Sequence, residues 1–121
     1  MRELMKALKA MSDETRLRIL SLLLERECCV CEVMQALNIS QTRASRNLHI
    51  LYDAGFLRLQ REGLWSLYSI DWEGMPEYFS DLLNAAKKTL KGNTETTHDR
   101  ERLMKAERIG PACVRERQLR A

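Results

Sequence analysis

Residues 40–54 read SQTRASRNLHILYDA, and this stretch decides which fold the sequence predicts. Its apolar residues Ala44, Leu48 and Leu51 recur at the spacing that places them on one face of a helix. Ser40 is of a residue type that caps helix N-termini. The stretch is therefore predicted to be one amphipathic helix whose opposite face is polar.

A shorter helix is predicted immediately before it. Residues 31–37 carry an apolar pattern that ends at Asn38, a residue type that tolerates the left-handed conformation found just past helix ends. Gly55 is a natural end for the longer helix. Two helices around a tight turn are typical of the helix-turn-helix, whose second helix enters the major groove of DNA.

Two short segments rich in apolar and aromatic residues follow, at residues 56–60 and 64–70. Arg61-Glu62-Gly63 separates them with a turn-like break, so the two segments are predicted to form an antiparallel hairpin. A hairpin in this position is the wing of a winged helix. The predicted fold class is thus mainly α with a small β-hairpin, a winged helix-turn-helix.

The longer helix and the wing supply the candidate DNA-binding residues. No acidic residue lies between Val33 and Tyr52, so this surface can approach phosphates without repulsion. Arginine can fork onto guanine or pair with phosphate, and amide and hydroxyl side chains can contact bases or backbone. The candidates are Ser40, Gln41, Thr42, Arg43, Ser45, Arg46, Asn47, His49 and Arg61. The competing interpretation is an ordinary polar solvent face, which the position between a tight turn and a hairpin disfavours.

Amphipathic helices are also predicted on both sides of this motif. Residues 4–11 place Leu4, Leu8 and Met11 on one face, and Ser12 can cap a following helix that runs to about residue 25 or 26. The last helix is predicted from Pro76 to about residue 91, with an apolar stripe at Phe79, Leu82, Leu83, Ala86 and Leu90.

The first and last helices are expected to make a homodimer, because so small a chain cannot cover both of their apolar stripes. Residues 1–91 would then form one DNA-binding and dimerisation domain. Residues 92–121 are rich in Thr, Arg, Lys and Glu and hold no aromatic residue. They are expected to be a charged, flexible tail, disordered or loosely helical.

The composition permits binding to nucleic acid without requiring it, since the 121 residues carry a net charge of +3. No stretch approaches the roughly 20 apolar residues that span a bilayer, and the first eleven residues are too charged for a signal peptide. A cytoplasmic protein without a membrane partner is expected. In that reducing compartment, four cysteines indicate metal binding or redox activity rather than a disulfide scaffold.

Three of the cysteines, Cys28, Cys29 and Cys31, lie together. Thiolates are soft ligands that favour ions such as arsenic(III), antimony(III), cadmium, lead or copper(I). On a regular helix Cys29 and Cys31 would point about 200° apart, so a site made of all three needs a distorted helix start. Such a site would couple ion binding to movement of the next helix. The alternative is that some of these cysteines are simply small buried residues.

Several motifs, in the same order along the chain, resemble the ArsR/SmtB family of metal-responsive repressors over roughly residues 4–90. They are Ser12-Asp13-Glu14-Thr15-Arg16-Leu17-Arg18-Ile19-Leu20, Cys29-Val30-Cys31-Glu32, Ser40-Gln41-Thr42-Arg43-Ala44-Ser45-Arg46-Asn47-Leu48 and Arg61-Glu62-Gly63. The resemblance implies a homodimer that binds a palindromic, double-stranded operator and releases it when a ligand binds. It favours the arsenic-responsive branch, so the implied inducer is arsenic(III) or antimony(III), and no permanent cofactor is expected.

The sequence departs from that branch at two positions. Relatives usually carry a third cysteine where this chain has Met34, and arsenic(III) is expected to take three sulfurs. Cys28 or the distant Cys113 could supply the missing sulfur. Leu64 stands in the wing where relatives often have a basic residue, which would weaken wing contacts to phosphate.

Other functions compatible with the sequence use the same residues differently. Cys28 and Cys29 could form a redox switch in a repressor of the same fold, and the cluster could sense cadmium or lead instead. A protein-binding adaptor is disfavoured by the arginines of the polar face. Zinc is disfavoured because only His49 and His98 offer imidazoles, and an enzyme is not expected because no base lies near the cysteines in sequence.

Overall fold

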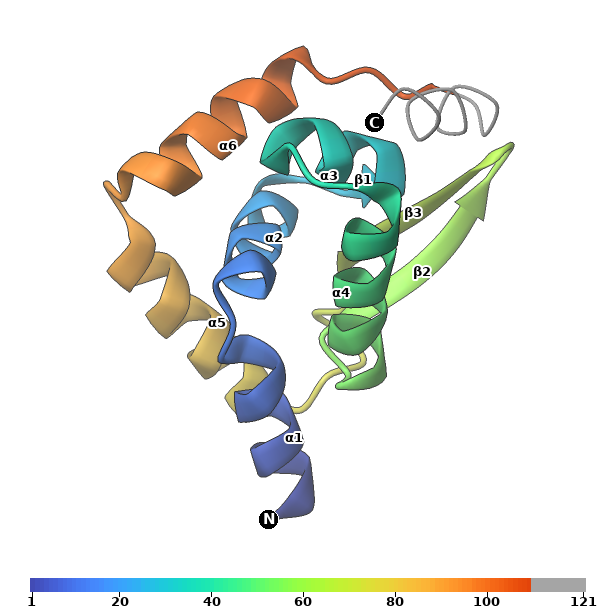
Figure 1. Cartoon of the computed structure of the whole chain (residues 1–121). Coiled ribbons are helices and arrows are strands. Elements are labelled where there is room, and N and C mark those ends of the chain that lie inside the picture. The colour runs from blue at the N-terminus through green and yellow to red at the C-terminus, as the bar shows by residue number, and fades with distance from the viewer. Residues whose placement is uncertain (110–121) are drawn as a thin grey trace.

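The computed structural model describes residues 1–109, which form a helical domain with one small antiparallel sheet. Its elements in chain order are α1 (Arg2–Met11), α2 (Glu14–Glu25), β1 (Cys28–Cys29), α3 (Val30–Leu37), α4 (Gln41–Asp53), β2 (Leu57–Glu62), β3 (Trp65–Ile70), α5 (Glu77–Leu90) and α6 (Thr94–Lys105) (Figure 1). The winged helix-turn-helix predicted from the sequence is confirmed: α3 and α4 are its two helices, and β2 and β3 are its wing.

The packing of α4 follows its sequence pattern. Ala44, Leu48 and Leu51 are fully buried in the core. Ser40 caps the helix, since its hydroxyl accepts the N–H of Arg43 at 3.2 Å. Asn38 ends α3 in the left-handed conformation with φ of 56°, so the tight turn between the two helices forms as predicted.

The sheet has one strand more than the predicted hairpin. β2 and β3 pair as expected across the turn at Gly63, which adopts a positive φ of 63°. β1 adds to the other edge of β3, with Cys28 opposite Tyr68 and Cys29 opposite Leu67. The segment that precedes α3 is therefore hydrogen-bonded to the inner strand of the wing.

Two details at the N-terminus differ from the sequence predictions. Asp13, not Ser12, caps α2, and its carboxylate accepts the N–H of Arg16 at 3.0 Å. On α1 the buried residues are Ala7 and Ala10, while Leu4 and Leu8 are 40% and 46% exposed. Small alanine side chains let α1 approach the domain closely, so its leucines are left on the outside.

The last helix of the predicted domain, α5, contributes Phe79 and Leu83 to the core of this single chain. Phe79 packs against Phe56 with ring centroids 4.6 Å apart. Leu82, Ala86 and Leu90 of the same helix stay half-buried. The predicted stripe is thus shared between the core and the surface.

The expectation of a flexible tail is wrong for its first part, because residues 94–105 form helix α6, which contacts α2 and α3. Asp99 is fully buried on α6 and accepts two hydrogen bonds from the guanidinium of Arg18 at 2.8 Å each. Arg102 also pairs with Asp99 at 2.8 Å. Such a charge-assisted network fixes a helix that holds few apolar residues.

None of the helices described is long and apolar enough to cross a membrane. The remainder of the predicted tail, with Cys113, lies outside the described residues.

Candidate DNA-binding face and cysteine segment

The exposed side of α4 carries most of the candidate DNA-binding residues. Thr42, Arg43, Arg46 and His49 are exposed, Gln41 and Ser45 are half-buried, and Ser40 is exposed at the N-cap. Arg61 is exposed on β2, near the tip of the wing. The structure therefore presents eight of the nine candidates to solvent at least in part, on α4 and the wing.

Asn47 is the exception, because the structure does not present this predicted DNA-contacting residue to solvent. It is buried, and its Oδ1 accepts a hydrogen bond from Nη1 of Arg16 at 3.0 Å. Its Nδ2 donates to the backbone carbonyl of Arg43 at 2.9 Å. Both ends of the amide are used inside the protein, so Asn47 joins α4 to α2.

Arg43 is also tied to α2, although it is exposed. Its Nη2 donates to the hydroxyl of Thr15 at 3.0 Å. This bond orients the guanidinium along the edge of α4 and leaves its other N–H groups available. Arg43 can therefore contact a phosphate from a fixed position, whereas Arg46 projects freely from the same helix.

The cysteine segment crosses the junction between β1 and α3. Cys28 and Cys29 form β1, and Cys31 lies in the first turn of α3. All three are at most 3% exposed. Neighbouring side chains of a strand point to opposite faces, so the strand holds Cys28 and Cys29 apart. In the ion-free protein, a short strand therefore precedes the helix, and Cys31 lies within the helix.

Each thiol has a polar neighbour that fixes it. Sγ of Cys28 donates to the carbonyl of Arg26 at 3.6 Å, and Sγ of Cys31 accepts from Nε2 of Gln35 at 3.3 Å. Cys29 caps α3 in a capping box with Glu32, whose Oε1 accepts the N–H of Cys29 at 3.0 Å. The cysteines are therefore part of the local scaffold as well as candidate ligands.

Burial disfavours the thiolate forms of two of these groups. It raises the pKa of Cys28 from 9.0 to about 12, with the negative charge of Glu32 adding to the effect. It also raises the pKa of Cys29, against the opposing effect of the backbone N–H of Glu32. A thiolate-binding ion must therefore displace protons and open this segment to reach the sulfurs.

Within residues 1–109, no three Cys, His, Asp or Glu side chains are assembled as a group that could hold a metal ion. The three sulfurs fit a thiophilic ion by their chemistry and their closeness in sequence, while their arrangement does not. Met34 is buried on α3, and His98 is exposed on α6. Binding of one ion by Cys28, Cys29 and Cys31 together would require the β1–α3 junction to rearrange.

Glu32 is a buried charged residue beside the cysteines whose contacts sequence reasoning missed. Its side chain is only 3% exposed and accepts from Nη2 of Arg26 at 2.6 Å and from Nε of Arg108 at 3.0 Å. Burial alone would raise the pKa of Glu32, but the N–H of Cys29 and these two guanidinium groups together lower it. The spacing of Cys29 and Glu32, N-cap to third helical residue, was the available signal for the capping contact.

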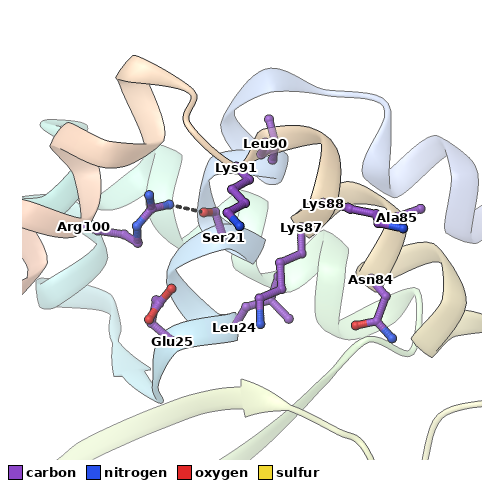
Figure 2. Close-up of a pocket in the computed structure, with 10 residues that line it drawn as sticks. All are labelled: Ser21, Leu24, Glu25, Asn84, Ala85, Lys87, Lys88, Leu90, Lys91 and Arg100. Carbon is purple, nitrogen blue, oxygen red and sulfur yellow. Dashed lines mark hydrogen bonds between the residues drawn. The ribbon is translucent and has the colours of Figure 1, made fainter.

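A separate pocket of about 690 Å³ lies between α2, α5 and α6 (Figure 2), and its lining includes no cysteine. Leu24, Ala85 and Leu90 give it an apolar lining, and Lys87 and Lys91 are among its charged residues. Arg100 donates to Ser21 at 3.3 Å at one end of this pocket (Figure 2). None of the candidate site residues lines it.

The known proteins to which this chain is similar in sequence are transcriptional regulators. The family model described as bacterial regulatory protein, arsR family, matches residues 13–58. The arsenic resistance transcriptional regulator ArsR2 of Pseudomonas putida is 39% identical over 92 residues, which cover 75% of this chain and 76% of the relative. A cadmium resistance transcriptional regulatory protein, a CadC homolog of Staphylococcus aureus, is 41% identical over 56% of this chain and 57% of its own length.

A solved structure shares the fold described above. It is the solution structure of a homodimeric winged helix-turn-helix DNA-binding domain from Mycobacterium bovis, a possible ArsR-family transcriptional regulator. The two chains superpose with a TM-score of 0.64 at 27% sequence identity, over 77% of this chain and 82% of the other.

Proposed function

Because this chain belongs to the ArsR family of bacterial regulatory proteins, we propose that it is a repressor that releases its operator when arsenite or antimonite binds to Cys28, Cys29 and Cys31. One observation carries the proposal. The cysteine segment pairs with β3 of the wing and also begins α3, the helix directly before α4. A change at the cysteines can therefore reach both elements that face DNA.

The DNA side of the proposal rests on charge and exposure. Arg43, Arg46 and Arg61 are exposed on α4 and the wing, and α4 has no acidic residue before Asp53. A double-stranded operator with two half-sites one helical turn apart would receive α4 of each subunit in successive major grooves. Arg46, which is exposed on α4, is proposed to contact a base or phosphate directly.

The ion side rests on the chemistry of thiolates. Cys29 and Cys31 are proposed as the principal pair of ligands, with Cys28 as the third. Arsenite and antimonite carry hydroxide groups, so each bond to sulfur would form as a bond to hydroxide breaks, and the thiol proton would leave on that hydroxide as water. The strong bonds to sulfur would offset the opening of a buried segment. Cys113, from the same subunit or its partner, is the alternative third ligand, in keeping with the absence of a cysteine at Met34.

A homodimer is proposed from the apolar surface that α1 leaves uncovered. Leu4, Met5 and Leu8 are 40–49% exposed on this helix. Tyr78 of α5 donates to Glu3 of α1 at 2.7 Å, so the two helices meet on one side of the domain. A twofold partner could cover this surface, and the similar domain from Mycobacterium bovis is homodimeric.

The experiment that tests the function is a titration of the reduced protein on a DNA duplex selected from random sequence. Arsenite, antimonite, cadmium and zinc are added in turn, while thiolate charge-transfer absorbance and DNA release are followed together. Arsenite and antimonite are expected to produce both signals. Release by cadmium alone would instead identify a cadmium sensor, and release by peroxide without any ion would identify a redox switch. If none of these releases DNA, the sensor assignment is wrong.

Serine variants then identify the ligands. Cys29→Ser and Cys31→Ser are each expected to abolish the response while leaving DNA binding intact. Cys28→Ser and Cys113→Ser are compared separately, because only the one that removes the third sulfur should abolish the response. Loss in Cys113→Ser alone would replace Cys28 in the proposed ligand set.

A further inference from the structure

Residues 106–109, here called the strap, leave the end of α6 and run over α3 toward the tip of the wing (Figure 1). Ala106 and Ile109 are partly buried against the hydrophobic core. The strap therefore lies on the domain through side-chain packing, and its polar contacts go to two different elements.

The first set of contacts is with the helix that carries Cys31. Gln35 and the backbone of Glu107 exchange two hydrogen bonds, of 2.8 Å and 3.1 Å. The same Gln35 amide donates to Sγ of Cys31 at 3.3 Å and to its carbonyl at 3.1 Å. Arg108 adds its 3.0 Å bond to the buried Glu32, which holds the N-cap at Cys29. The strap thus contacts the residues that fix two of the three thiols.

The second contact is with the wing. Nε1 of Trp65 donates to the carbonyl of Ile109 at 3.1 Å. Trp65 begins β3 and pairs with Glu62, immediately beside the turn at the tip of the wing. Two successive residues, Arg108 and Ile109, therefore bind the cysteine segment and the wing.

We propose that the strap holds the cysteine segment in its buried, ion-free geometry and transmits a change in that segment to the wing. The positioning residues are Arg108, which bonds Glu32, and Trp65, which bonds the strap from the wing. This inference rests on the proposed function for its ligand, a thiophilic ion. The strap would connect the cysteine segment to the wing by a second path, separate from the pairing of β1 with β3.

Capture of an ion would open the β1–α3 junction and so change the surroundings of Glu32 and Gln35. The strap favours the closed junction because its bonds to both side chains are made there. A ligand that binds only the open junction must work against these bonds. Through the strap, the position of the wing would depend on whether the junction is closed or open. Allosteric coupling requires such a difference in contacts between two states.

Arg108→Ala is a suitable test because Glu32 keeps its other two donors, Arg26 and the N–H of Cys29, and the variant is expected to fold. Reaction of the ion-free protein with a chromogenic disulfide reagent measures how often the thiols become accessible. Arg108→Ala is expected to react about fivefold faster than wild type, the effect of roughly one net intramolecular hydrogen bond. Lys105→Ala removes the same charge from an exposed position of α6 and should react at the wild-type rate, and Arg108→Lys should recover part of the difference.

The wing end is tested with Trp65→Phe, which keeps an aromatic ring and removes the N–H donor. The quantity measured is the ratio of operator affinity without arsenite to that with saturating arsenite. This ratio is expected to fall about fivefold in Trp65→Phe and in Arg108→Ala, and to remain unchanged in Lys105→Ala. Thiol reactivity should rise in Arg108→Ala, because Arg108 bonds Glu32, which holds the N-cap at Cys29. It should stay near wild type in Trp65→Phe, because the lost bond joins the strap to the wing.

The outcomes separate this inference from the proposed function. Wild-type thiol reactivity in Arg108→Ala would overturn the strap's role at the cysteines, whichever ion the protein senses. An unchanged affinity ratio in Trp65→Phe would overturn its role at the wing. If no thiophilic ion causes the wild-type protein to release DNA, the proposed function fails. The thiol measurement still decides whether the strap closes the cysteine segment.

Discussion

Asn47 of the recognition helix α4 accepts a hydrogen bond from Arg16 of α2 at 3.0 Å, and both side chains lie largely inside the protein. Arg16 also donates to the carbonyl of Ala10 at 2.6 Å, so one guanidinium connects α1, α2 and α4. The orientation of α4 is therefore fixed by this polar contact with α2 as well as by the packing of its apolar face.

Replacing Asn47 with Ala should destabilise the fold rather than remove a DNA contact. The variant leaves an N–H of Arg16 and the carbonyl of Arg43 without this partner, which typically costs about 1–2 kcal/mol. The measurement is urea unfolding followed by circular dichroism at one fixed protein concentration. Thr42→Ala, on the exposed side of α4, should stay within about 0.5 kcal/mol of wild type, so equal stabilities of the two variants would contradict this prediction.

Arg46→Ala should weaken operator binding about tenfold, with little effect on stability, because this exposed side chain has solvent around it in the free protein. The dependence of log affinity on log salt should also become shallower by about one unit if the contact is to phosphate. Fluorescence anisotropy at several salt concentrations measures both quantities. Lys91→Ala, with the same charge change at the end of α5, is the control, and a loss of affinity as large as that of Arg46→Ala would indicate a nonspecific charge effect.

Leu8→Glu should convert the proposed dimer to a monomer without unfolding it. Leu8 is 46% exposed in the single chain, so its replacement disturbs little of the core, while a carboxylate would be costly inside an apolar interface. Sedimentation velocity gives the mass, and circular dichroism gives the helix content. Met104→Glu places the same charge on α6, where Met104 is 86% exposed, and should remain dimeric. A dimeric Leu8→Glu would move the interface away from α1.

Alkaline pH should destabilise the reduced, ion-free protein through Cys28. Burial raises the pKa of this thiol in the folded state from 9.0 to about 12, so the folded protein retains its proton where the unfolded chain loses it. The stabilising contribution is complete below pH 9 and is lost as the pH rises toward about 12, at up to about 1.4 kcal/mol per pH unit. Unfolding free energies of wild type and Cys28→Ala are compared across this range, and parallel curves would argue against a perturbed Cys28.

The fold was largely predictable because the sequence patterns of its central helix and hairpin are local. Ala44, Leu48 and Leu51 of α4 have the helical period, and the hairpin has its turn at Gly63. β1 could not be predicted, since two residues carry no periodicity and the strand exists only through pairing with Tyr68 and Leu67. This strand explains why Cys28 and Cys29 lie outside α3, whose first turn holds Cys31.

The contacts that the sequence did not predict involve partners far away in the chain. Asn47 looks like any polar residue of a recognition helix until Arg16 is placed beside it, 31 positions earlier. Helix α6 is polar in composition, and its packing rests on the contact between Asp99 and Arg18, which are 81 positions apart. Local sequence patterns do not encode such pairings. A segment with few apolar residues can still be an ordered helix when a buried ion pair joins it to the rest of the domain.

The burial of the cysteine segment also has a consequence for the timing of a response. Thiols that are at most 3% exposed can meet an ion only during transient opening of the β1–α3 junction. At low ion concentration the observed rate rises with concentration, because capture competes with reclosing. At high concentration the rate reaches a plateau equal to the opening rate. If the proposed function holds, the opening of this junction, and not the supply of ion, would then set how quickly DNA is released.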